Sequence, residues 1–209
     1  VKNRFGPADE IGVFEMTEAG LSEVTNPSAL FLADHDKNVS GASVFAGIEG
    51  TRPVLLEIQC LIAPSPQPSP RRAVIGWDSN RLAMILAVME SRYGLSIVNS
   101  EVYLNVAGGL KISETAADLA VAAAIISFCT EQPVPEKTII FGEIGLSGEI
   151  RAISQITPRL KEAEKLGFTQ AIIPIIKNYS NKQKIESKIK IIQIKHLGDL
   201  IAMFPKNKN

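Results

Sequence analysis

An alanine-rich run from Thr115 to Phe128 limits the possible folds of this chain more than any other segment. Its small side chains are typical of a helix that packs closely against a sheet. The carboxylates of Glu114 and Asp118 favour the positive, N-terminal end of such a helix. We therefore expect a central helix here, with the other elements arranged around it.

Segments on both sides of this run have the patterns of strands. Turn residues at 50–53 separate two apolar stretches and favour a hairpin of two long strands. Apolar and polar side chains alternate in the first expected strand, as in a strand with one buried face, and lysines on the last fit a protected edge. The expected strands cover residues 10–16, 39–49, 54–62, 101–106, 171–174 and 188–194, and a further hairpin covers residues 141–150.

Caps and apolar spacing indicate three further helices. Asp78 or Ser79 can cap a helix that ends near Gly94, where glycine suits a left-handed C-cap. Pro158 suits the first turn of a helix that continues to about residue 166, and a short amphipathic helix is expected at residues 196–204. This alternation of strands and helices predicts an α/β (α+β) domain with a mixed sheet, packed helices and β-hairpins.

A proline-rich segment at residues 63–72 interrupts these elements. No helix or central strand accommodates such a segment, so we expect an exposed connecting loop. Arg71 and Arg72 at its end are candidate DNA contacts, because guanidinium groups bind backbone phosphates without reading sequence, and Lys111 is a third candidate. Proline-rich loops can also bind aromatic grooves, so a protein-interaction module is one alternative function.

Because its charges balance, the chain has no overall positive electrostatic field that would attract nucleic acid. The chain has 22 basic and 22 acidic residues and a formal net charge of zero, so contacts with DNA depend on local patches. Cys60 and Cys129 lie far apart in the sequence, which argues against a zinc finger, and no metal site is predicted. Without a signal peptide or a bilayer-length apolar run, a cytoplasmic protein with no membrane partner is expected.

Three short motifs resemble the bacterial RadA (Sms) recombination proteins. They are Lys-Asn-Arg-Phe-Gly at residues 2–6, Glu-Gly-Thr-Arg-Pro at residues 49–53 and Asp-Ser-Asn-Arg-Leu-Ala at residues 78–83. The resemblance covers nearly all of the chain and implies the C-terminal portion of such a protein. A linker arm at residues 1–9 would carry the first motif, a Lon-like domain would follow at residues 10–209, and a RecA-like ATPase core would precede both. The chain begins with valine, as a fragment of a longer protein would.

The stretch from Ser100 to Leu160 also looks like the proteolytic core of a Lon-type protease. In such peptidases a nucleophilic serine opens the alanine-rich helix, and a partner lysine follows a Gly-Glu hairpin. These two positions fall on Ala116 and Thr157 in this chain. A hydroxyl needs an adjacent base to become a nucleophile, and here both groups are missing. The resemblance therefore implies a Lon-like fold that is a pseudo-protease.

A displaced dyad is the enzymatic alternative. Ser113 and Lys161 flank the two vacated positions, and a lysine can act as a base when burial lowers its pKa. Against this, Lys161 lies in a run of alternating charge, residues 159–165, that is typical of a solvated helix face. The sequence therefore leaves two interpretations open, a divergent Ser/Lys peptidase and a non-catalytic domain.

The RadA resemblance implies a parent that is a DNA-dependent ATPase and branch-migration helicase in recombinational DNA repair. Lys2 and Arg4 would then reach into the ATP site of the neighbouring subunit, where a guanidinium stabilises the transferring phosphoryl group. This chain has no P-loop motif, so we expect no cofactor and no activity in it alone, whereas the parent would use ATP with magnesium and an upstream zinc finger. The implied partners are further copies in a homohexameric ring, single-stranded or branched DNA, and RecA.

Overall fold

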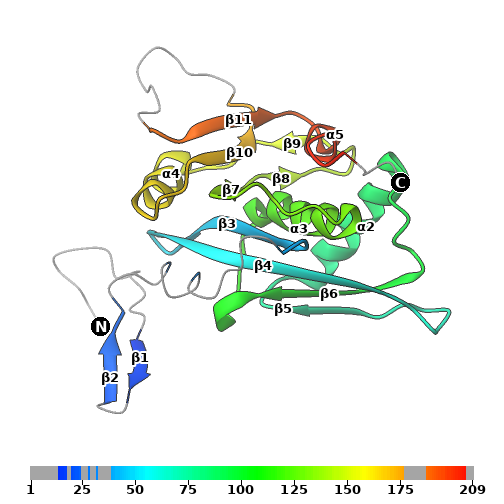
Figure 1. Ribbon diagram of the computed structural model, residues 1–209, viewed down its shortest axis with the longest axis horizontal. Helices are drawn as coiled ribbons and strands as arrows, with labels where there is room; N and C mark the ends of the chain where they lie inside the picture. The colour runs from blue at the N-terminus through cyan, green and yellow to red at the C-terminus, as the bar shows by residue number, and fades with distance from the viewer. Residues whose placement is uncertain are drawn as a thin grey trace.

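The computed structural model describes residues 14–17, 20–24, 28, 32, 39–176 and 187–205. Its centre is a seven-stranded mixed sheet, shown in Figure 1. The strands are β3 (Ala42–Glu49), β4 (Arg52–Pro64), β5 (Arg72–Ile75), β6 (Ser100–Val106), β7 (Thr138–Ile140), β10 (Gln170–Pro174) and β11 (Lys190–Ile194). They lie in the order β11-β10-β7-β3-β4-β6-β5, which confirms the predicted mixed sheet.

Strands β3 and β4 form the predicted long hairpin. They pair antiparallel from Ala42 opposite Gln59 to Glu49 opposite Arg52. β4 also pairs antiparallel with β6, whereas the other four pairings of the sheet are parallel. The expectation that strand structure stops before Ala63 is wrong by two residues, because Ala63 and Pro64 still pair with β6. A proline is tolerated there because it is the last residue of the strand.

Within the described residues 39–205, four α-helices pack on or beside this sheet. They are α2 (Ser79–Tyr93), α3 (Asp118–Thr130), α4 (Ile156–Lys165) and α5 (Leu197–Ile201). The alanine-rich α3 is central as predicted: it packs against β3 and β4, and every residue from 119 to 126 is fully buried. Its α-helical turns begin later than expected, because Thr115–Ala117 form a separate 3₁₀ turn, η2.

Helix α2 has the two caps that its sequence predicts. The Asp78 carboxylate accepts a hydrogen bond from the Arg81 N–H at 2.8 Å. At the other end Gly94 has a φ of 66°, its N–H donates to the Glu90 carbonyl, and the N–H of Leu95 donates to the Met89 carbonyl. A side chain at this left-handed position would be strained, which explains the glycine.

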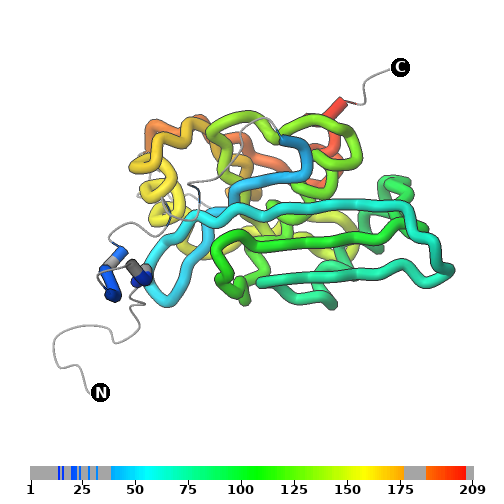
Figure 2. The backbone as a smooth tube through the Cα atoms, turned by 60° about the horizontal axis from the view of Figure 1, so that its bottom comes forward, coloured from blue at the N-terminus to red at the C-terminus, as the bar shows by residue number. Residues whose placement is uncertain are grey.

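Strands β4, β6 and β5 run side by side in Figure 2 and form one end of the sheet. At this end, only one of the two faces of the sheet is covered. Along β6, Val102, Leu104 and Val106 are buried, whereas Tyr103 and Asn105 between them are partly exposed. The opposite edge is β11, where Lys190 is exposed, as expected for an edge strand with protective charge.

Two small hairpins lie outside the main sheet. β8 (Glu143–Ile144) pairs antiparallel with β9 (Ile150–Arg151), which confirms the hairpin expected at residues 141–150. β1 (Phe14–Thr17) pairs antiparallel with β2 (Gly20–Glu23), and in Figure 1 this hairpin lies away from the seven-stranded sheet. The expectation that the first strand has a buried apolar face is wrong for this chain, because Phe14 and Met16 are exposed.

Candidate functional site

The two vacated positions lie on elements that the fold brings together. Ala116 is in η2, is only 3% exposed, and its carbonyl accepts a hydrogen bond from the Gly142 N–H at 2.8 Å. Thr157 is exposed in the first turn of α4, close to the predicted Pro158. Ala116 has no hydroxyl and Thr157 has no amine, so the two positions do not form a Ser/Lys dyad.

A buried ion pair joins the segments that carry these two positions. Arg159, two residues after Thr157, is 2% exposed and contacts Glu114, two residues before Ala116. The two guanidinium Nη atoms lie 2.6 and 3.1 Å from the two carboxylate oxygens, so the contact is bidentate. Such paired bonds fix both the distance and the relative orientation of the two groups. The ion pair therefore ties α4 to the segment that leads into α3.

Aromatic rings and backbone groups enclose this ion pair. The Arg159 guanidinium lies 6.0 Å from the Phe45 ring centroid and 5.5 Å from that of Phe141, and it donates to the Ala46 carbonyl at 2.5 Å. The Glu114 carboxylate also accepts from the Ile48 N–H at 2.7 Å. A guanidinium can stack on rings and bind a carboxylate at once. Through these contacts, both charged groups stabilise the fold.

A second buried carboxylate anchors the first turn of α3. Asp118 has a fully buried side chain that contacts the Arg81 guanidinium from α2 and accepts from the Ile144 N–H at 3.0 Å. Burial raises the pKa of Asp118, whereas the hydrogen bonds from Arg81 and Ile144 act in the opposite direction. The carboxylate thus links α2, α3 and the β8–β9 hairpin at one point.

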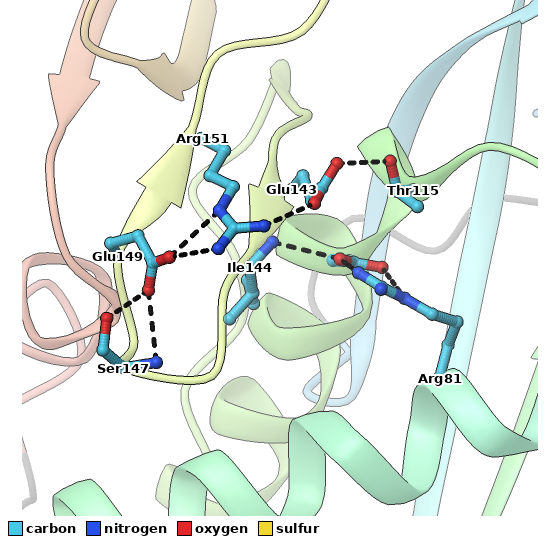
Figure 3. Close-up of polar contacts among 8 residues, drawn as sticks. Arg81, Thr115, Glu143, Ile144, Ser147, Glu149 and Arg151 are labelled. Atoms are coloured by element: carbon cyan, nitrogen blue, oxygen red, sulfur yellow. Dashed lines mark hydrogen bonds and ion pairs between the residues drawn. The ribbon is translucent and has the colours of Figure 1, made fainter.

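A chain of polar contacts runs over the surface beside this point, as Figure 3 shows. The Thr115 hydroxyl donates to Glu143 at 2.7 Å, and Arg151 bridges Glu143 at 3.4 Å and Glu149 at 2.7 Å. Glu149 also accepts from the backbone N–H and hydroxyl of Ser147. Hydrogen bonding by Ser147, with a further contribution from Arg151, lowers the pKa of Glu149 to about 2. The hairpin turn is therefore held by ionised groups at neutral pH.

The structure does not bring the alternative pair, Ser113 and Lys161, into contact. Both residues lie in the described range 39–176, both are exposed, and no hydrogen bond joins them. A nucleophile and its base must lie within hydrogen-bond reach of each other, which these two side chains do not. The exposed face expected for residues 159–165 is correct at Lys161 but wrong at Arg159, which points into the protein.

The three candidate DNA contacts have different environments. Arg72 begins β5, and its guanidinium donates to the carbonyls of Ser100 and Ile97, the latter at 3.2 Å. Arg71 and Lys111 are exposed. Lys111 lies beyond the far end of β5, where the neighbouring Ile112 N–H bonds to Gly76 at 2.8 Å. Five extended residues span roughly 16 Å, so Arg71 and Lys111 flank the edge strand rather than form one cluster.

A cavity of about 250 Å³ lies away from the vacated positions. It is bounded by the start of β3, the loop before β7 and the residues that follow α4, with Val44, Val134 and Phe168 in its wall. Its lining holds neither of the vacated positions and neither of the alternative pair. The cavity therefore adds no catalytic group to the site described above.

Some predictions fall on residues that the structure does not describe. Lys2, Arg4 and the boundary between residues 9 and 10 all lie outside the described residues. Within the described ranges, no three His, Cys, Asp or Glu side chains are grouped so that they could hold a metal ion. Of the helices in the described part of the chain, none has the length and apolar character needed to cross a bilayer.

Sequence reasoning missed the ion pairs Arg159–Glu114 and Arg81–Asp118. Glu114 and Asp118 were expected only to favour the N-terminal end of the central helix. The neighbours of Arg159 gave one signal that its side chain is buried. Arg159 lies between Pro158, which starts the helix, and Leu160, which is fully buried. The identity of its partner depends on a contact across 45 residues, which no local pattern gives.

The chain is similar in sequence to a known protein family and to several known proteins. Residues 78–177 match the family model described as subunit ChlI of Mg-chelatase. The chain is 56% identical to the DNA repair protein RadA of Brucella abortus over 97% of its length, and 45% identical to that of Escherichia coli over 97%. The RadA protein of Rickettsia felis is 55% identical over 95% of the chain. The match covers 43–44% of each of these relatives, so the chain spans less than half of their length.

Proposed function

We propose that this chain, which is RadA-like in sequence over nearly its whole length, is a non-proteolytic Lon-like scaffold of a DNA repair protein. The Arg159–Glu114 ion pair supports the proposal, because it joins the segments that carry Thr157 and Ala116. A nucleophilic hydroxyl and a base would have to lie in this region for peptide cleavage. A buried ion pair, by contrast, fixes the relative position of two elements, as an assembly domain requires.

In the parent, this domain holds subunits in a homohexameric ring and contacts DNA. The relatives are named for DNA repair, and the parent is proposed to be a DNA-dependent ATPase and branch-migration helicase in recombinational repair. Its cofactors would be ATP with magnesium and an upstream zinc ion, and its partners RecA and single-stranded or branched DNA. Lys2 and Arg4 would act on the ATP of the adjacent subunit. Residues 39–205 supply the scaffold rather than the chemistry.

The two alternatives have less support. A divergent peptidase would need Ser113 and Lys161 to meet, whereas both are exposed and no hydrogen bond joins them in the described structure. A module that recruits partners through the proline-rich loop remains compatible with the exposed residues 67–69. Neither alternative uses the buried ion pairs. The scaffold function accounts for them, because rigid connections between α4, α3 and α2 transmit the geometry of one subunit to the next.

Light scattering coupled to size-exclusion chromatography tests the assembly role. The parent is expected to form a ring, and removal of residues 39–205 is expected to reduce its assembly. A parent that is monomeric at high protein concentration, both with and without ATP, would contradict the proposal. Labelling by a serine-reactive probe that is lost in Ser113→Ala would instead support the peptidase.

Salt dependence tests the proposed DNA contact. Replacement of Arg71 by alanine is expected to flatten the plot of log affinity against log salt by roughly one unit, because one phosphate contact is lost. Lys195→Ala is the matched control, since Lys195 is also exposed and follows β11 at the opposite edge of the sheet. An unchanged slope in Arg71→Ala and in Lys111→Ala would remove these residues from the DNA interface.

A further inference from the structure

The β1–β2 hairpin carries an apolar face that nothing in the described part of the chain covers. Phe14, Met16 and Leu21 are 57%, 77% and 70% exposed. Met16 pairs directly with Leu21, and Phe14 precedes Met16 by two residues on the same strand. Residues with this spacing and pairing point to one face of a two-stranded ribbon.

Three large apolar side chains that are exposed on one small hairpin indicate a surface that is buried in the complete protein. A hairpin of two strands is marginally stable in water unless a third element covers its apolar side. The hairpin lies away from the seven-stranded sheet in Figure 1, and its main packing is between its own two strands. Its apolar face therefore needs a partner outside the main body of this domain.

The size of the face favours a partner within the same polypeptide. Together the three side chains expose on the order of 400 Å², about half of the ~800 Å² per partner that a stable intermolecular interface buries. A tethered partner avoids much of the entropy cost of association, so a smaller surface suffices. More than half of the length of the RadA relatives lies outside the region that matches this chain.

We infer that the apolar face of β1–β2 docks intramolecularly on the part of the parent that lies outside these 209 residues. The inference rests on the proposal that the chain works within a longer RadA-like protein. The docked surface should itself be apolar, because the contacting side chains are Phe14, Met16 and Leu21. Arg4 lies shortly before Phe14 in the sequence. Docking would thus restrict the arm that carries Lys2 and Arg4 and hold it near the ATPase portion of the parent.

Hydrogen exchange of the backbone amides in the full-length parent tests this inference. The amides of residues 14–17 and 20–23 are expected to exchange at least tenfold more slowly in the wild type than in Met16→Lys or Leu21→Lys. Met16→Leu should keep the protection, since it preserves the apolar contact. Ile75→Lys is the control, because Ile75 on β5 is 64% exposed and its replacement should leave the hairpin protected.

Three outcomes would overturn the inference. The hairpin amides could exchange as fast in the wild-type parent as in Met16→Lys, Ile75→Lys could have the same effect as Met16→Lys, or protection could appear only at protein concentrations that produce oligomers. The last outcome would assign the face to a second copy. Light scattering of the same samples separates this inference from the proposed function. A monomeric parent with a protected hairpin contradicts the ring alone, and a ring with an unprotected hairpin contradicts the docking alone.

Discussion

Arginine at position 159 combines three contacts that a lysine could not make together. Its planar guanidinium binds Glu114 through two nitrogens, donates to the Ala46 carbonyl and stacks near two aromatic rings. An ammonium group on a flexible stem has no matching planar geometry. At the scale of the single residue, Arg159 thus stabilises the fold through the contact that ties α4 to the segment leading into α3.

Replacement of Arg159 tests the structural role of this pair. Arg159→Ala leaves a partly buried carboxylate without its partner and is expected to lower the free energy of unfolding by about 3–5 kcal/mol. Arg159→Lys keeps the charge but loses hydrogen bonds to a charged group, with an expected loss of about 1.5–3 kcal/mol. Urea unfolding followed by circular dichroism measures both. Arg151→Ala should lower the free energy of unfolding far less than Arg159→Ala, because the Arg151 side chain is 56% exposed and its ion pairs are screened by solvent.

The stability of the domain should decrease at acidic pH, because the Glu149 carboxylate becomes protonated. Its pKa is lowered from 4.5 to about 2 by the hydrogen bonds of Ser147 and by Arg151. The stability from these contacts is therefore fully present above pH 4.5 and is lost as the pH falls toward 2. In Glu149→Gln, the urea midpoint should depend less on pH in this window. Glu131→Gln, a change at an exposed carboxylate, should leave the wild-type dependence; equal curves for Glu149→Gln and wild type would contradict the prediction.

The sequence predicts these single positions unequally well. The missing hydroxyl and amine at Ala116 and Thr157 are read directly from residue identity. The burial of Arg159 cannot be read from the sequence in this way, because the alternating charges around it have the pattern of a solvated helix. Glu114 lies 45 residues away, and only the packing of α4 against β3 and β4 brings the two together. Charge patterns describe a helix surface on average, whereas a buried ion pair depends on one tertiary contact.

At the scale of elements, local chemistry determines where α2 begins. The sequence offered Asp78 or Ser79 as the cap, and the structure assigns it to Asp78. Asp78→Ala should lower the free energy of unfolding by about 1 kcal/mol, since the Arg81 N–H loses its acceptor. Ser79→Ala is the neighbouring control and should change the free energy by less than about 0.5 kcal/mol. A larger loss in Ser79→Ala would place the cap one residue later.

Elements defined by distant pairing were harder to predict than α2. β5 and β7 have four and three residues, and neither was expected as a strand. β7 is recognisable only because it lies between β3 and β10 in the sheet, and β5 because it pairs with β6. The long β3–β4 hairpin was predicted correctly, since its turn residues are adjacent to both strands. Short strands without a local turn carry too few residues for a periodic pattern.

At the scale of the whole molecule, the ion pairs connect elements that the sheet alone does not hold. Arg81 and Asp118 join α2 to α3, and Arg159 and Glu114 join α4 to the start of η2. The two ion pairs therefore add connections between helices to those that the central sheet provides. The β1–β2 hairpin is the exception, because it lies away from the sheet and leaves its apolar face exposed. This contrast fits the proposed function, in which the arm before the hairpin would act on a neighbouring subunit.

Substitution of Arg4 in the parent tests this arrangement at the level of the assembly. If the guanidinium stabilises the transferring phosphoryl group of the adjacent subunit, Arg4→Ala should reduce ATP turnover by on the order of 10³-fold or more while ring formation survives. Arg71→Ala should leave turnover without DNA unchanged. Mixing Arg4→Ala subunits with subunits that cannot bind ATP should restore part of the turnover, because mixed rings place an intact Arg4 beside an intact ATP site. Absence of recovery in rings shown to be mixed would mean that Arg4 acts within its own subunit.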